Sequence, residues 1–131
     1  MNVTLEIINF FPDDFCYKAV RLYDSEDSNL LPHWNHTYKF ISEAKKSGGK
    51  CLVHCRMGIS RSSSTVCAYL MREKLWTKSQ ALEYVKECRS IICPNDGFLE
   101  QLDEYEGIVM ARCVDISISL TCSLGCLFHY E

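Results

Sequence analysis

The chain has 131 residues, a length that suits a single domain. Hydrophobic residues make up 47% of it and charged residues 24%, which are ordinary values for a globular protein. The net charge of −3 is mild, so the composition indicates neither nucleic acid nor an anionic membrane as a partner. No apolar run approaches the roughly 20 residues that a membrane-spanning helix needs.

Nine cysteines are many for this length, and the number is odd. The N-terminal segment MNVTLEIINFFPDD has no basic stretch and is not typical of a secretory signal. We therefore expect a reducing compartment and free thiols, most of them small core residues.

The first third of the chain predicts short strands followed by a helix. Residues 3–8 are apolar and β-prone, and residues 19–22 predict a second strand that runs into an acidic loop at 23–29. From Leu30 to Lys46 the apolar residues recur at helical spacing, and the glycines that follow are typical of a helix end.

The middle of the chain alternates in the same way. Residues 50–54 predict a strand, and a helix is expected to begin near Arg61, because serines favour helix starts. Thr77 predicts the next helix N-terminus, with Gln80 three residues later completing a capping box. A last helix is expected after Pro94. Since strands alternate with helices, the sequence predicts an α/β fold built on a sheet.

The C-terminal residues 114–131 differ in character from the rest. Charged residues become scarce there, and no helical period continues. We therefore expect one domain over residues 1–113, followed by a tail at 114–131.

The stretch VHCRMGISRSSS, residues 53–64, places a thiol between the expected strand and the expected helix. A disulfide, a metal ligand, an inert core thiol and a catalytic nucleophile are all roles open to this cysteine. A loop that leads into a helix N-terminus is suited to anion binding, because its N–H groups can turn inward and the helix dipole adds positive charge. Gly58 permits a backbone conformation that a Cβ would hinder, and the planar fork of Arg61 matches two phosphate oxygens.

The same environment favours Cys55 as a nucleophile. A helix N-terminus and nearby cations lower the pKa of a thiol, so Cys55 can be a thiolate at neutral pH. Ser62 can donate a hydrogen bond to the sulfur when it leaves, and His54 is expected to orient the loop rather than exchange protons. The full string His-Cys-x-x-Gly-x-x-Arg-Ser is far more specific than a cysteine and an arginine at this spacing alone.

Hydrolysis of a phosphate ester also needs a proton for the leaving oxygen, which a carboxylic acid near the loop can supply. The acidic loop offers Asp24, Glu26 and Asp27. At least two of these three carboxylates are expected to be solvated loop charges, and the residue types alone leave the choice open.

Together these residues resemble the cysteine-based dual-specificity protein phosphatases, and more closely the Slingshot phosphatases. The resemblance covers about residues 2–112 and rests on NVTLEIINFFP, VRLYDSEDSNLLPHWNHTYKFISEAKKSGGKCLVHCRMGISRSSSTVCAYLMRE and PNDGFLEQLDEYEGIVMA. It implies a central mixed sheet flanked by helices, without the family's N-terminal strand–helix portion. The tail at 114–131 matches nothing in the family.

The resemblance also implies roles by position. Cys55 matches the nucleophile and Arg61 the phosphate-binding arginine. Asp24 matches the general acid, and Ser62 the hydroxyl that aids breakdown of the phosphocysteine. Asn95 matches an asparagine that steadies the loop, and it also suits a helix N-cap. The rest of the phosphate-binding loop is expected to be His54, Arg56, Met57, Gly58, Ile59 and Ser60.

The implied activity is hydrolysis of phosphoserine, phosphothreonine and phosphotyrosine through a phosphocysteine, without metal or other cofactor. The implied substrates are phosphorylated cofilin/ADF-type actin regulators, with association with filamentous actin and a cytoplasmic, cytoskeletal location. The alternative is a catalytically impaired fragment that binds a phosphoprotein or actin, because a missing N-terminal portion would weaken the support of the loop.

Three other interpretations fit less well. Inositide phosphatases usually carry more basic residues in the loop, whereas here only Arg56 lies between Cys55 and Arg61. Low-molecular-weight phosphatases place the loop near the N-terminus and the acid far downstream. A zinc site near the C-terminus would have a spacing that fits no familiar pattern. Its ligands would be Cys113, Cys122, Cys126 and His129.

Overall fold

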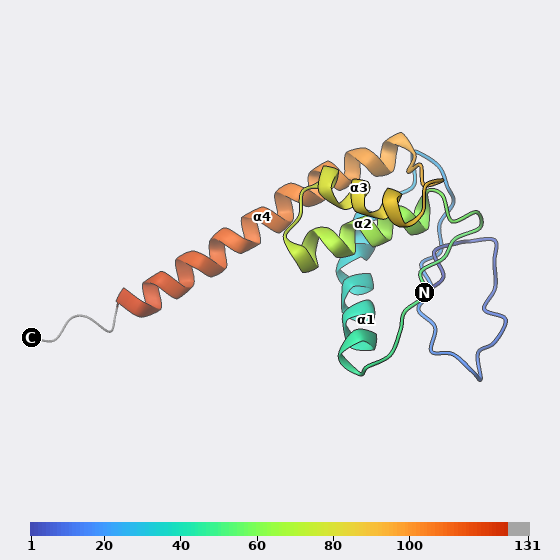
Figure 1. Cartoon of the computed structure of the whole chain (residues 1–131), viewed down its shortest axis with the longest axis horizontal. Helices are drawn as coiled ribbons and strands as arrows, with labels where there is room; N and C mark the ends of the chain where they lie inside the picture. The colour runs from blue at the N-terminus through green and yellow to red at the C-terminus, as the bar shows by residue number, and fades with distance from the viewer. Residues whose placement is uncertain (126–131) are drawn as a thin grey trace, which may run out of the picture.

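The computed structural model describes the backbone of residues 1–125 and the side chains of residues 1–114. Its elements are one short 3-10 helix and four α-helices: η1 (Leu31–His33), α1 (Trp34–Lys46), α2 (Arg61–Lys74), α3 (Lys78–Cys88) and α4 (Asp96–Gly125). The N-terminal segments and the loop before α2 lie at one end of these helices, and α4 extends beyond them at the other (Figure 1).

Helix α2 is the centre of the scaffold, because it packs against α1, α3 and α4. The shared core includes Met71 of α2 and Phe98 and Leu102 of α4, all fully buried. Trp34 of α1 is buried as well and meets the ring of Tyr105 edge-on, with ring centroids 5.1 Å apart. Burying one such side chain contributes about 1.5 to 3 kcal/mol. The helix that begins at Arg61 is therefore held on three sides.

Three segments of the chain pair in parallel at the end of the helices where the loop before α2 lies (Figure 1). Asn2 lies between Ala19 and His54 and pairs with both in parallel register. Backbone hydrogen bonds of 2.8 to 3.0 Å flank each pair. Within residues 1–125, the structure limits this pairing to single residue pairs. The expectation of an extended mixed sheet is therefore not confirmed.

Local side-chain bonds explain why residues 3–8 do not form the expected strand. The Thr4 hydroxyl accepts a hydrogen bond from the backbone N–H of Ile7 at 3.1 Å. The amide of the buried Asn2 side chain donates to the Ile7 carbonyl at 2.7 Å. Bonds of this kind compete with strand pairing. The chain turns after residue 4, which ends the pairing that the apolar pattern predicted.

The expected helix starts are confirmed. Helix α2 begins at Arg61. Thr77 caps α3 through a complete capping box with Gln80, whose backbone N–H lies 3.3 Å from the Thr77 hydroxyl. The helix expected from Leu30 is divided into η1 and α1, with Pro32 in the short first part, where its missing N–H costs nothing.

The expectation that no helical structure continues past residue 113 is wrong for the backbone. Helix α4 runs without a break to Gly125. Its hydrogen bonds are internal to the segment, so a helix can continue where no amphipathic period marks it. The division between a domain at 1–113 and a tail at 114–131 stays a prediction, and side chains beyond residue 114 lie outside the described ones.

The cysteines with described environments are less uniformly buried than expected. Cys55 and Cys67 are buried, and burial raises the pKa of Cys67 to about 12, as befits an inert core thiol. Three of the free thiols are instead exposed: Cys16, Cys88 and Cys93. The prediction that most cysteines are core residues is therefore wrong in this part of the chain.

Gly97, in the first turn of α4, lets the acidic loop approach closely. A Cβ at this position would lie 2.7 Å from the Cα of Glu26, whereas a Cβ on Gly107 would meet nothing within 4 Å. Gly97→Ala should therefore destabilise the fold by about 1 to 3 kcal/mol. Gly107→Ala, the matched control, should be neutral or stabilising by up to about 1 kcal/mol. Thermal unfolding measures both, and equal effects would contradict the close approach.

Candidate active site

The loop of residues 55–60 joins the segment that pairs with Asn2 to the start of α2. His54 contributes its backbone to that pairing, which fixes where the loop begins. Gly58 has a φ of +67°, the left-handed conformation that glycine tolerates best. The Ser60 hydroxyl is buried and accepts a hydrogen bond from the backbone N–H of Asn95 at 3.1 Å. The loop is thus anchored at both ends.

Cys55 lies inside this loop with its sulfur surrounded by donors. The Sγ atom is 3.2 Å from the Ser62 hydroxyl and accepts a hydrogen bond from the backbone N–H of Gly58 at 3.2 Å. Burial raises the pKa of the Cys55 thiol, but hydrogen bonds from Ser62, Gly58 and the N–H of Ile59 outweigh it and lower the pKa below its usual value. Cys55 is therefore suited to being a thiolate.

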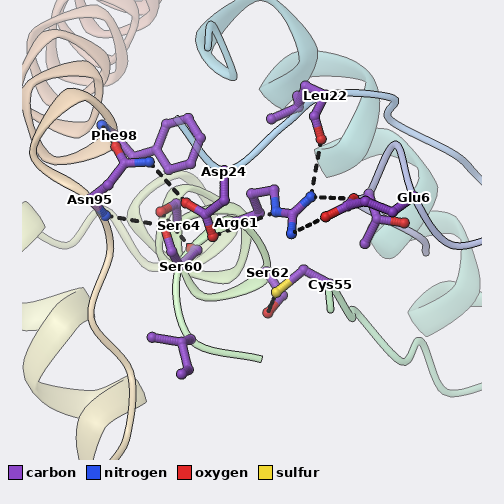
Figure 2. Close-up of polar contacts among 12 residues, drawn as sticks. Glu6, Leu22, Asp24, Cys55, Ser60, Arg61, Ser62, Ser64, Asn95 and Phe98 are labelled. Carbon is purple, nitrogen blue, oxygen red and sulfur yellow. Dashed lines mark hydrogen bonds and ion pairs between the residues drawn. The ribbon is translucent and has the colours of Figure 1, made fainter. Parts of the chain in front are cut away.

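The guanidinium group of Arg61 is almost completely buried, at 3% exposed, and is held at one end by Glu6. Its Nη1 and Nη2 donate to the two Glu6 carboxylate oxygens at 2.7 and 3.0 Å, and Nη1 also donates to the Leu22 carbonyl at 3.1 Å. Figure 2 shows the guanidinium between Glu6 and Asp24. The hydrogen bonds with Arg61 lower the pKa of Glu6 from 4.5 to about 2, so Glu6 stays ionised.

The Nε side of the Arg61 guanidinium carries no hydrogen bond. Its Nε is buried and has no hydrogen-bond partner, although Asp24 Oδ2 lies 3.6 Å away. Nη2 has a second N–H on this same edge. A buried donor without a partner is costly and calls for an explanation. The Nε–Nη2 edge is the fork that two oxygens of a phosphate can occupy.

Asp24 is connected to both the loop and α4. Its Oδ1 accepts a hydrogen bond from the Asn95 side-chain amide at 2.9 Å. The side-chain oxygen Oδ1 of Asn95 accepts a hydrogen bond from the N–H of Phe98 at 2.9 Å, so Asn95 also caps α4, as expected. The structure pairs Asp24 with Arg61, and it pairs neither Glu26 nor Asp27 with that guanidinium.

The structure thus brings together Cys55, Ser62, Arg61, Asp24 and Asn95, which the sequence singled out. The expected loop residues surround them: His54, Arg56, Met57, Gly58, Ile59 and Ser60. Arg56 and Met57 are exposed, so they face solvent at the rim. The catalytic roles of these residues stay predictions.

Two contacts of the site were not predicted from the sequence. One is Glu6, whose signal was only an isolated carboxylate in an otherwise apolar N-terminal segment. The other is Arg89, which follows α3 and donates from Nε to the Gly58 carbonyl at 2.9 Å and from Nη2 to the Met57 carbonyl at 3.2 Å. Nothing in the pattern around Arg89 distinguishes it from other surface arginines.

A hollow of about 980 Å³ lies beside the site rather than in it. It shares only His54 with the loop and is lined largely by apolar side chains, among them Phe10, Phe11 and Phe15. These walls offer few hydrogen-bond donors to an anion, whereas the loop around Cys55 offers backbone N–H groups.

Within the described side chains, no group of three His, Cys, Asp or Glu residues is placed to hold a metal ion. The zinc ligands considered from the sequence, Cys122, Cys126 and His129, lie outside that part of the chain. None of the helices described is both long and apolar enough to span a membrane.

Comparisons with known proteins identify the class to which this loop belongs. Residues 1–108 match the dual specificity phosphatase catalytic domain family, and the chain belongs to that family. The resemblance to Slingshot phosphatases is confirmed as well. The chain is 58% identical over 111 residues to human protein phosphatase Slingshot homolog 2 and 53% identical over 111 residues to Drosophila melanogaster protein phosphatase Slingshot. Each match covers 85% of this chain but only 8% and 11% of those relatives.

Solved structures support the same fold. The human tyrosine phosphatase-like serine/threonine/tyrosine-interacting protein is 34% identical with a TM-score of 0.78, covering 83% of this chain and 78% of that one. Human DUSP28 is 32% identical with a TM-score of 0.74, covering 85% and 79%. The prediction of a dual-specificity phosphatase-like fold is therefore confirmed, while the extent of its sheet is not.

Glu6→Gln should weaken the binding of tungstate, a phosphate analogue, by about tenfold, or about 1.4 kcal/mol. The neutral amide no longer holds the end of the Arg61 guanidinium with two charge-assisted bonds, so the Nε–Nη2 edge is less well oriented. Asp14→Asn, which removes a carboxylate from the same N-terminal region but not from Arg61, is the control. Isothermal titration calorimetry measures the tungstate affinity of both variants. Equal affinities of Glu6→Gln and Asp14→Asn would contradict this role of Glu6.

Acid should also break the ion pair between Glu6 and Arg61 in the unchanged protein. The Glu6 pKa is lowered, so the ion pair contributes fully above pH 4.5 and is lost as the pH falls towards 2.

Proposed function

We propose that this chain is a cysteine-dependent protein phosphatase that hydrolyses phosphoserine, phosphothreonine and phosphotyrosine. The observation that carries the proposal is the pair formed by a buried thiol of lowered pKa and a buried guanidinium whose Nε has no hydrogen-bond partner. An anion that accepts from that edge and from the loop N–H groups is held against Cys55. The family match supports the same reaction.

The first chemical step follows from the arrangement around Cys55. The thiolate attacks phosphorus, a sulfur–phosphorus bond forms and the bond from phosphorus to the substrate oxygen breaks. Asp24, held beside Arg61 and Asn95, gives a proton to the leaving oxygen. Arg61 stabilises the charge on the phosphoryl oxygens throughout.

The second step releases phosphate. Water attacks phosphorus, Asp24 takes up its proton, and the sulfur–phosphorus bond breaks. The Ser62 hydroxyl, 3.2 Å from Sγ, donates a hydrogen bond to the departing thiolate. Both steps balance with water as the only co-reactant, so the proposed reaction needs no cofactor.

We further propose phosphorylated cofilin/ADF-type actin regulators as the substrate, with association with filamentous actin in the cytoplasm. The basis is the Slingshot resemblance, which extends over 111 residues at 58% identity. The alternative of an impaired binding fragment gains no support from the site, because the thiol, the arginine and the acid are brought together.

Cys55→Ser should reduce turnover to the background rate while a phosphopeptide still binds. A serine hydroxyl in this loop is a far weaker nucleophile than a thiolate, whereas Arg61 and the backbone N–H groups still hold the phosphate. Release of inorganic phosphate and fluorescence anisotropy of a labelled phosphocofilin peptide measure the two properties. Retained turnover in the pure variant would refute Cys55 as the nucleophile. If the unchanged chain binds the phosphopeptide but does not hydrolyse it, the alternative of a catalytically impaired binding fragment is favoured.

Asp24→Asn should slow hydrolysis of phosphoserine by about a hundredfold or more, but that of an aryl phosphate with an acidic leaving group much less. A serine alkoxide needs a proton in order to leave, whereas a stable aryl oxide does not. Glu26→Gln and Asp27→Asn are matched controls from the same loop. If Asp27→Asn shows this leaving-group dependence and Asp24→Asn does not, the acid has been assigned to the wrong carboxylate.

A further inference from the structure

Arg89 contacts the outer side of the loop from the end of α3. Its backbone N–H donates to the Val85 carbonyl and closes the last turn of the helix. Its side chain, which is exposed, then reaches the loop. Nε lies 2.9 Å from the Gly58 carbonyl oxygen, and Nη2 lies 3.2 Å from the Met57 carbonyl oxygen. One planar side chain therefore holds two successive carbonyl groups of the loop.

These two carbonyls belong to the peptide units whose N–H groups act on the Cys55 sulfur. The Met57 carbonyl shares a peptide plane with the N–H of Gly58, which donates to Cys55 Sγ at 3.2 Å. The Gly58 carbonyl shares a plane with the N–H of Ile59, which also lowers the pKa of that thiol. In a trans peptide the C=O and N–H groups point in opposite directions. Fixing each oxygen outward therefore fixes each N–H inward.

We propose that Arg89 is a positioning residue that fixes the orientation of these two peptide planes, so that their N–H groups face the sulfur of Cys55. The role deepens the phosphatase reaction proposed above, because it acts on the reacting sulfur through the backbone. The positive charge beside the carbonyl oxygens also polarises both peptides, which strengthens their N–H groups as donors.

The contact between Arg89 and Gly58 is closely fitted. A Cβ on Gly58 would lie only 3.0 to 3.3 Å from three atoms of the Arg89 guanidinium. The positive φ of Gly58 already disfavours a side chain there. The glycine thus serves two purposes: it allows the turn that exposes both carbonyls, and it leaves the space in which Arg89 reaches them.

Other charges around Cys55 stay in place when Arg89 is changed. The charged or titratable side chains in and around the loop, apart from Arg89, are Glu6, Asp24, His54, Arg56 and Arg61. None of them donates a side-chain bond to the Met57 or Gly58 carbonyl. A change in the protonation of Cys55 after substitution of Arg89 therefore reports on the two bonds and the charge that Arg89 supplies.

The test is the pH dependence of Cys55 alkylation by iodoacetamide, followed by mass spectrometry of the peptide that carries Cys55. Arg89→Met should move the profile to higher pH and slow alkylation by about three- to tenfold on its acid side, where the rate follows the thiolate fraction. Lys86→Met is the matched control, because Lys86 is an exposed cation of the same helix that bonds neither carbonyl. It should leave the profile close to that of the unchanged chain.

Arg89→Lys provides a second arm that keeps the charge and is less disturbing to the fold. Lysine lacks the planar fork that holds two carbonyls together, so its profile should move in the same direction by a smaller amount. Profiles of Arg89→Met and Arg89→Lys that coincide with the unchanged chain would overturn the proposal, as would an equal shift in Lys86→Met. If Arg89→Met does not fold, Arg89→Lys decides the outcome. Alkylation needs no turnover, so this result is independent of whether the chain proves to be a phosphatase.

Discussion

The buried guanidinium group of Arg61 is the interaction on which the site depends. A charge at 3% exposure is costly unless partners replace the water that it has lost. Glu6 supplies two of the bonds and the Leu22 carbonyl a third, so the group ties α2 to two segments far away in the sequence. The Nε of the remaining edge has no hydrogen bond, although the Asp24 carboxylate lies 3.6 Å from it. The same side chain therefore holds the fold together and presents donors to a ligand.

The rest of the structure fixes the positions of the Arg61 guanidinium and the Cys55 thiol relative to each other. Helix α2 is fixed by its contacts with three other helices, so its first residue has little freedom. Asn95 joins the start of α4 to Ser60 in the loop and to Asp24 in the acidic loop. A catalytic loop works only when such supports hold it close to its productive geometry. The polar contacts shown in Figure 2 are those supports.

Local sequence patterns predicted the features formed by residues close together in the chain, but they did not predict contacts between distant residues. The loop from Cys55 to Ser62 and the capping box at Thr77 follow from residues close together in the chain, and both are placed as expected. Glu6 is 55 residues from Arg61, and Arg89 is 31 from Gly58, so no local period could reveal either contact. The apolar pattern of residues 3–8 predicted a strand because it cannot show that Asn2 and Thr4 bond to Ile7.

The covalent state of Cys55 during turnover shows whether its thiolate attacks phosphorus. Ser62→Ala should slow the release of the sulfur, so the intermediate should accumulate when this variant is mixed with an aryl phosphate and quenched with acid. If Cys55 is the nucleophile, the mass spectrum of the digested protein should show one phosphoryl group per chain, attached to Cys55. Turnover that continues without phosphate on Cys55, or with phosphate on another residue, would contradict this assignment.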